Sequence, residues 1–127
     1  MAVGALGVIA GLAAWVTIVT AAGFVMRGAW PAYASVADAM TFTLPMMIAR
    51  LTIGAFATLA MGCTTAAIAR RSTVPAVLAG VLLLLAFIPV HVTIWEKFPI
   101  WYHLTFLLSL IPLTLAGAKL VRPGKKG

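Results

Sequence analysis

The stretch Val74–Val121, VPAVLAGVLLLLAFIPVHVTIWEKFPIWYHLTFLLSLIPLTLAGAKLV, contains two long apolar runs on either side of a very short polar break. The runs are Val74–Trp95 and Ile100–Val121, and each exceeds the roughly 20 residues that an α-helix needs to cross a hydrocarbon core. The break at Glu96–Pro99 leaves room only for a tight turn. The two helices must therefore run antiparallel and side by side as a hairpin.

Two more runs of the same kind come earlier in the chain, at Val3–Met26 and Leu44–Ala69. The first has no Lys or Arg before it and is too long for the apolar part of a signal peptide, so we expect it to be retained as a helix. Four such spans predict an all-α, up-and-down bundle of four transmembrane helices that forms a single domain. Between the first two spans, Pro31 followed by Ala32–Phe42 predicts a short interfacial helix at the outer surface of the membrane.

The composition supports a membrane protein. Of the 127 residues, 64% are apolar and 9% are charged, whereas a soluble domain carries about 25% charged residues. Nine basic and two acidic side chains give a net charge of +7. The basic residues lie at the ends of the spans, which is typical of membrane topology and not of a nucleic-acid interface. We therefore expect the lipid bilayer as a partner and no nucleic acid.

Charge also predicts the orientation. Four spans place both termini and the middle connection on one side, and that side carries six basic residues, Arg70, Arg71, Lys119, Arg122, Lys125 and Lys126. The opposite side carries only Arg27 and Lys97. The positive-inside rule then places both termini in the cytoplasm, in a membrane such as the bacterial inner membrane. Aromatic residues predict an interfacial belt on the outer side, formed by Trp30, Tyr33, Trp95, Trp101 and Tyr102.

Small residues predict where helices touch. Gly7 and Gly11 in the first span form a small-xxx-small pair, which lets another backbone approach closely. Gly54 and Gly62 suggest a similar role for the second span. The spacing does not say whether the partner helix belongs to the same bundle or to a second chain.

Arg50 is the one charge well inside a span. Counted from Thr43, it lies about 10 Å along the helix at about 1.5 Å per residue. A charge at this depth must extend to the headgroups, pair with an acid or bind an anion. The candidate acids are Asp38 and Glu96, and the candidate anion is a ligand or lipid headgroup.

His91 and His103 lie roughly 6 Å inside the outer boundary on the two helices of the hairpin. We therefore expect their side chains to approach each other and to point into the bundle. They could be two separate interfacial histidines, a polar network that couples the helices, or a proton relay. Two histidines with a carboxylate are also a ligand set for a divalent metal, and two facing histidines can hold a haem.

The sequence contains no phosphate loop and no arrangement typical of nucleophilic catalysis. It resembles the small multidrug exporters only in its size and number of spans. Their mechanism needs an embedded acid in the first helix, and Val3–Met26 contains no charge. We expect a non-enzymatic membrane protein without a cofactor, either an accessory subunit that assembles with other membrane subunits or a small oligomer of this chain. The alternatives are a carrier of an anionic or lipid-like ligand that uses Arg50, and a metal- or haem-binding protein that uses His91 and His103.

Overall fold

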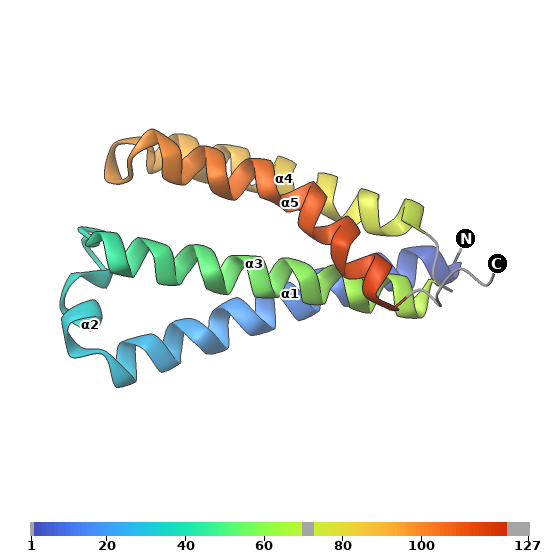
Figure 1. Cartoon of the computed structure of the whole chain (residues 1–127), viewed down its shortest axis with the longest axis horizontal. Coiled ribbons are helices and arrows are strands. Elements are labelled where there is room, and N and C mark those ends of the chain that lie inside the picture. The colour runs from blue at the N-terminus through green and yellow to red at the C-terminus, as the bar shows by residue number, and fades with distance from the viewer. Residues whose placement is uncertain (1, 70–72, 122–127) are drawn as a thin grey trace.

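The computed structural model describes residues 2–69 and 73–121, and its regular structure there is helical. The elements in chain order are α1 (Ala2–Ala29), α2 (Pro31–Ala37), α3 (Leu44–Ile68), α4 (Thr73–Thr93), the 3₁₀ turn η1 (Trp95–Lys97) and α5 (Ile100–Val121). Helices α1, α3, α4 and α5 are each long and apolar enough to cross a membrane. The expected all-α bundle of four membrane-spanning helices is therefore confirmed (Figure 1).

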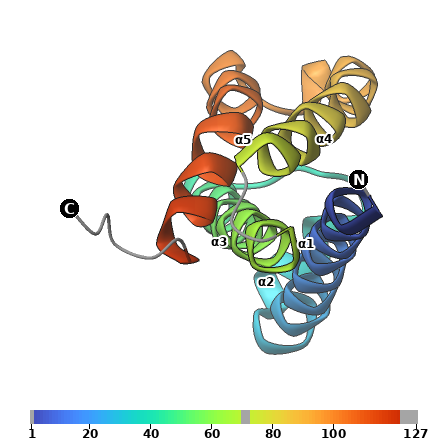
Figure 2. The same ribbon diagram turned by 90° about the vertical axis from the view of Figure 1, so that its right-hand side faces the viewer.

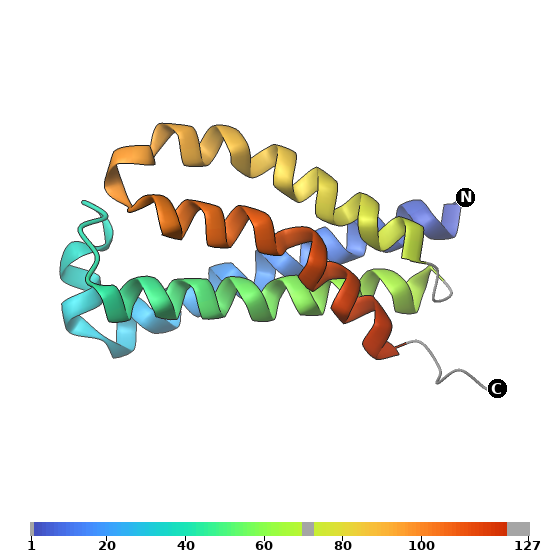
Figure 3. The same cartoon turned by 45° about the horizontal axis from the view of Figure 1, so that its top comes forward.

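Helix α3 lies at the centre of the bundle. Its most extensive contacts are with α1 on one side and with α5 on the other, and α4 packs mainly against α5 (Figure 2). Figure 3 shows α4 and α5 as the expected antiparallel hairpin, with η1 at the same end of the bundle as α2. We call this the α2 end. Helix α1 begins and helix α5 ends at the opposite end of the molecule (Figure 1).

Three helix boundaries differ from the expected ones by two residues or more. Helix α1 continues to Ala29 instead of ending at Met26, and α4 ends at Thr93, so that Trp95 belongs to η1. The short helix α2 ends at Ala37 and does not reach Phe42. The chain turns there because Met40 adopts a left-handed backbone conformation with φ of 59°, which cannot continue a helix.

The α3–α5 crossing depends on two glycines that face each other's helices. A Cβ atom at Gly62 would overlap the carbonyl oxygen of Thr114 and lie 2.9 Å from its carbonyl carbon. A Cβ atom at Gly117 would likewise overlap the carbonyl oxygen of Leu59. The two backbones are therefore in direct contact, and the Cys63 Sγ–H donates to the Gly117 carbonyl oxygen across 3.2 Å.

The other predicted packing glycines also make their contacts within this chain. A Cβ at Gly7 would lie 2.8 Å from the Thr65 carbonyl oxygen, and one at Gly11 would lie 2.9 Å from the Met61 carbonyl oxygen. Gly54 lies against the ring of Phe106, on α5. The small-residue faces of α1 and α3 are thus used to assemble the bundle itself.

Much of the outside of the bundle is apolar, as expected for helices that face lipid. Several large apolar side chains are more than 70% exposed, namely Phe24, Val74, Leu108 and Leu120. Of the basic residues expected on the cytoplasmic side, Lys119 lies near the end of α5. The remaining five, Arg70, Arg71, Arg122, Lys125 and Lys126, lie outside the described residues.

Candidate functional site

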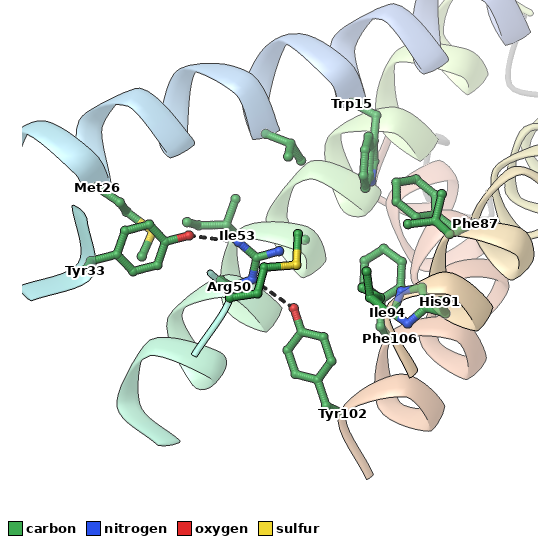
Figure 4. A pocket seen from close by; sticks show the side chains of 14 residues that line it. Trp15, Met26, Tyr33, Arg50, Ile53, Phe87, His91, Ile94, Tyr102 and Phe106 are labelled. Carbon is green, nitrogen blue, oxygen red and sulfur yellow. Dashed lines mark hydrogen bonds between the residues drawn. The ribbon is translucent and has the colours of Figure 1, made fainter. Parts of the chain in front are cut away.

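A cavity of about 210 Å³ lies inside the bundle near the α2 end. All five α-helices contribute to its wall, which is mainly aromatic and aliphatic (Figure 4). Its polar lining groups are Arg50 from α3, His91 from α4, and the hydroxyls of Tyr33 from α2 and Tyr102 from α5. The remaining lining residues are Trp15, Val19, Met26, Met40, Ile53, Gly54, Phe87, Val90, Ile94 and Phe106.

Arg50 is held in this cavity by neutral aromatic side chains. Its Nη1 donates to the Tyr33 hydroxyl oxygen at 2.8 Å, and its Nε donates to the Tyr102 hydroxyl oxygen at 3.1 Å (Figure 4). The guanidinium carbon lies 4.7 Å from the centre of the Phe42 ring and 5.7 Å from that of Phe98. These hydrogen bonds and cation–π contacts fix the orientation of the guanidinium group but do not neutralise its charge.

The structure does not bring the two acidic residues to Arg50, which contradicts one of the three alternatives given above, a pair with Asp38 or Glu96. Asp38 accepts a hydrogen bond from Arg27 at 3.1 Å on the exposed surface. It does so because α2 ends early and leaves Asp38 beside the last turn of α1, where Arg27 lies. Glu96 is exposed on η1 and forms no ion pair within the described part of the chain.

Arg50 therefore keeps unused hydrogen-bond donors. A guanidinium has five N–H groups, and two of them donate to the tyrosines. Within residues 2–69 and 73–121, Nη2 of Arg50 has no hydrogen-bond partner. Among the side-chain nitrogen and oxygen atoms of these residues that lack a partner, only Thr65 Oγ1 is fully enclosed by protein. Nη2 is therefore accessible, and it belongs to a side chain that lines the cavity.

The two histidines meet as expected. The Nδ1 atoms of His91 and His103 are 2.6 Å apart, and both side chains are buried. His103 Nε2 lies 3.0 Å from the Trp95 carbonyl oxygen, which ties the end of the hairpin together. His91 also stacks on Phe106, with ring centres 5.0 Å apart.

This geometry does not fit a metal or a haem iron held between the two rings. A metal with bonds of about 2.0–2.1 Å to each nitrogen would need them at least about 3.3 Å apart in tetrahedral geometry, whereas the Nδ1 atoms are separated by 2.6 Å. Three of the four ring nitrogens are already in hydrogen bonds. Within the described ranges, no group of three His, Cys, Asp or Glu side chains gathers to complete a ligand set.

The sequence assigned Tyr33 and Tyr102 to the interfacial belt, but both are buried and hold Arg50. Trp95 and Trp101 are exposed, as a belt requires, and Trp30 is half-buried and stacked on Tyr33. One signal could have revealed the cavity wall. The aromatic pairs at spacing four, Phe87 with His91 and Tyr102 with Phe106, each share one helix face.

Comparisons with protein-family models, with curated proteins and with solved structures find no match to this chain.

Proposed function

We propose that this protein binds or carries an anionic, lipid-like molecule whose headgroup is held by Arg50. The observation that carries the proposal is a guanidinium inside a helix long and apolar enough to span a membrane, with unused donors at a cavity and with no carboxylate beside it among the residues that the structure describes. A charge in such a place is costly unless an opposite charge offsets it. Phosphate and carboxylate groups can accept two parallel hydrogen bonds from a guanidinium group. The guanidinium of Arg50 is already oriented by two tyrosines.

The size of the cavity supports a headgroup as its occupant. Pockets that enclose a whole drug-sized ligand measure about 300–1,000 Å³, and this cavity measures about 210 Å³. A headgroup and the first carbons of a chain suit this volume, and the aromatic and aliphatic wall suits those carbons. The rest of an acyl or prenyl chain would lie along the apolar outer faces of the helices, in the bilayer.

We also propose that the α2 end faces the outside of a bacterial inner membrane and that both termini are cytoplasmic. The distribution of basic residues along the sequence supports this orientation. The cavity would then take its ligand from the outer leaflet. Binding or transfer, without a chemical step, is the activity that we propose.

Assembly with other membrane subunits, or with further copies of this chain, stays a prediction. The glycine faces that suggested it make their contacts within the bundle. No contact among the described residues favours assembly over ligand binding, so we treat the two as independent.

Native mass spectrometry of the purified protein in a mild detergent tests the proposal. Phosphatidic acid and oleate are the probes, and Arg50→Gln is the variant. A hydrogen-bonded charge contributes about 1.5–3 kcal/mol, so we expect Arg50→Gln to retain roughly 10- to 100-fold less anionic lipid. Arg50→Lys keeps the charge without the guanidinium group and should lie between the two.

Arg27→Gln is the matched control, because it removes a basic residue at the same end of the bundle but away from the cavity. It should bind like the unmodified protein. Equal retention by Arg50→Gln and the unmodified protein, with both shown to be helical and monodisperse, would contradict the proposal. A loss of the same size in Arg27→Gln would show that binding is a general surface effect.

A further inference from the structure

The buried histidine pair has a single arrangement of hydrogens when both rings are neutral. The Trp95 carbonyl oxygen can only accept, so the His103 Nε2 that lies 3.0 Å from it must donate. A neutral imidazole has one N–H group, and His103 Nδ1 is therefore an acceptor. His91 Nδ1 donates to it across 2.6 Å. This assignment, made from the hydrogen-bond partners, leaves His91 Nε2 without a hydrogen.

His91 Nε2 has no partner of its own. His91 is 5% exposed and lines the cavity, and no group in the described part of the chain forms a hydrogen bond with Nε2. His91 Nε2 is not completely enclosed, because Thr65 Oγ1 is the only side-chain polar atom of these residues that is both enclosed and without a partner. Nε2 therefore keeps some accessible surface. A buried acceptor at a mainly apolar wall is satisfied only if a donor enters the cavity.

The cavity thus offers two opposite kinds of group. Arg50 provides positive charge and N–H donors, whereas His91 provides a lone pair. Tyr102 connects them, because its hydroxyl accepts from Arg50 and its ring stacks on His91 with centres 6.3 Å apart. An anionic oxygen is attracted to the positive charge of Arg50. An anionic oxygen placed opposite His91 Nε2 would be repelled, because both atoms present lone pairs and neither carries a hydrogen.

We propose that the bound headgroup carries a hydroxyl hydrogen in addition to its negative charge, with the anionic oxygen at Arg50 and the hydroxyl donating to His91 Nε2. This inference rests on the proposed function. A singly protonated phosphomonoester has both features on one phosphorus atom, and a phosphodiester that bears a glycerol has them on neighbouring groups. A carboxylate, or a diester with a plain alkyl group, has no hydrogen to donate.

A competition among three lipids with the same acyl chains tests this selectivity by native mass spectrometry. The lipids are phosphatidic acid, phosphatidylglycerol and phosphatidylethanol, of which the last is a diester without a hydroxyl group. One buried hydrogen bond gives a preference of roughly 10-fold, so we expect at least one of the first two to exceed phosphatidylethanol by that factor. Preference for phosphatidic acid identifies a phosphomonoester, and preference for phosphatidylglycerol identifies the glycerol diester.

Equal retention of all three lipids would overturn this inference while leaving anion binding by Arg50 intact. Retention of none would overturn the proposed function as well. The two failures are therefore distinguishable in one experiment.

Two variants locate the selectivity in the histidine pair. His103→Phe removes the acceptor for His91 Nδ1, so the hydrogen of His91 is free to move to Nε2, and the preference over phosphatidylethanol should disappear while anionic lipid still binds. The double variant His91→Phe with His103→Phe removes both partners and avoids an unpaired imidazole between the helices. It should also bind the three lipids equally, and an unchanged preference in either folded variant would overturn the inference.

Discussion

The α3–α5 crossing predicts that Gly62→Ala destabilises the bundle. A Cβ at this position overlaps the Thr114 carbonyl oxygen and lies 2.9 Å from its carbonyl carbon and 3.0 Å from the backbone nitrogen of Ala118. Ordinary contacts of this kind begin at 3.4 Å, so the two helices must separate by at least about 0.5 Å even at the carbon. The obstacle is backbone, which cannot rotate away as a side chain could.

We expect this separation to cost about 2–3 kcal/mol of unfolding free energy, the upper part of the range of about 1–3 kcal/mol seen when cores are overpacked. Separation of the helices would also lengthen the Cys63–Gly117 hydrogen bond. Gly23→Ala is the control, because a Cβ there meets no atom within 4 Å. Its unfolding free energy should change by less than about 0.5 kcal/mol, or rise slightly because Ala favours helix.

Reversible unfolding in mixed micelles measures this difference. The purified variants are titrated with sodium dodecyl sulfate in a mild detergent, and helix content is followed by far-ultraviolet circular dichroism. Gly62→Ala should unfold at a clearly lower fraction of dodecyl sulfate than Gly23→Ala. If the two variants unfold at the same fraction, the reasoning that the α3–α5 backbones are in contact at Gly62 is refuted.

Three further predictions use the same unfolding assay. Tyr33→Phe and Tyr102→Phe each delete a hydroxyl that accepts from Arg50, so each should lower the unfolding free energy by about 1 kcal/mol; two unchanged midpoints would show that the tyrosines do not hold the arginine. Trp15→Phe deletes the indole N–H that donates to the Thr58 hydroxyl at 3.1 Å and should also cost about 1 kcal/mol, and a neutral result would contradict this buried bond. Arg27→Gln breaks only an exposed ion pair, so a change above about 0.5 kcal/mol would be unexpected.

The fold could be predicted largely from the hydropathy of the spans and from the prolines at their boundaries. Helix α3 begins at Leu44 and α5 spans Ile100–Val121, as expected from the sequence. Both starts follow from the prolines beside them, at Pro45 and Pro99, which suit the first turn of a helix or the position before it. The end of α2 could not be predicted, because it depends on a left-handed conformation at Met40, a residue type that gives no signal for it.

The candidate site could be predicted only in part. Arg50 was evident as a lone charge in an apolar run, and the meeting of His91 and His103 followed from the tight hairpin. The partners of Arg50 were not evident, because Tyr33 and Tyr102 lie 17 and 52 residues away along the chain. Opposite charge suggested Asp38 instead, but Arg27 on the neighbouring helix turn binds that carboxylate.

The sequence by itself determined four spans, their antiparallel order and the depth of one cation within the second span. Hydropathy and rise per residue are local properties that add along the chain, so no knowledge of packing was needed. Only the tertiary structure decided which sides of the helices face each other. Those facing sides form the cavity, place the tyrosines around Arg50 and leave His91 Nε2 without a hydrogen-bond partner among the described residues. These depend on the rotation of each helix about its axis. That rotation is set by close contacts between small residues far apart in sequence, such as Gly62 with Thr114.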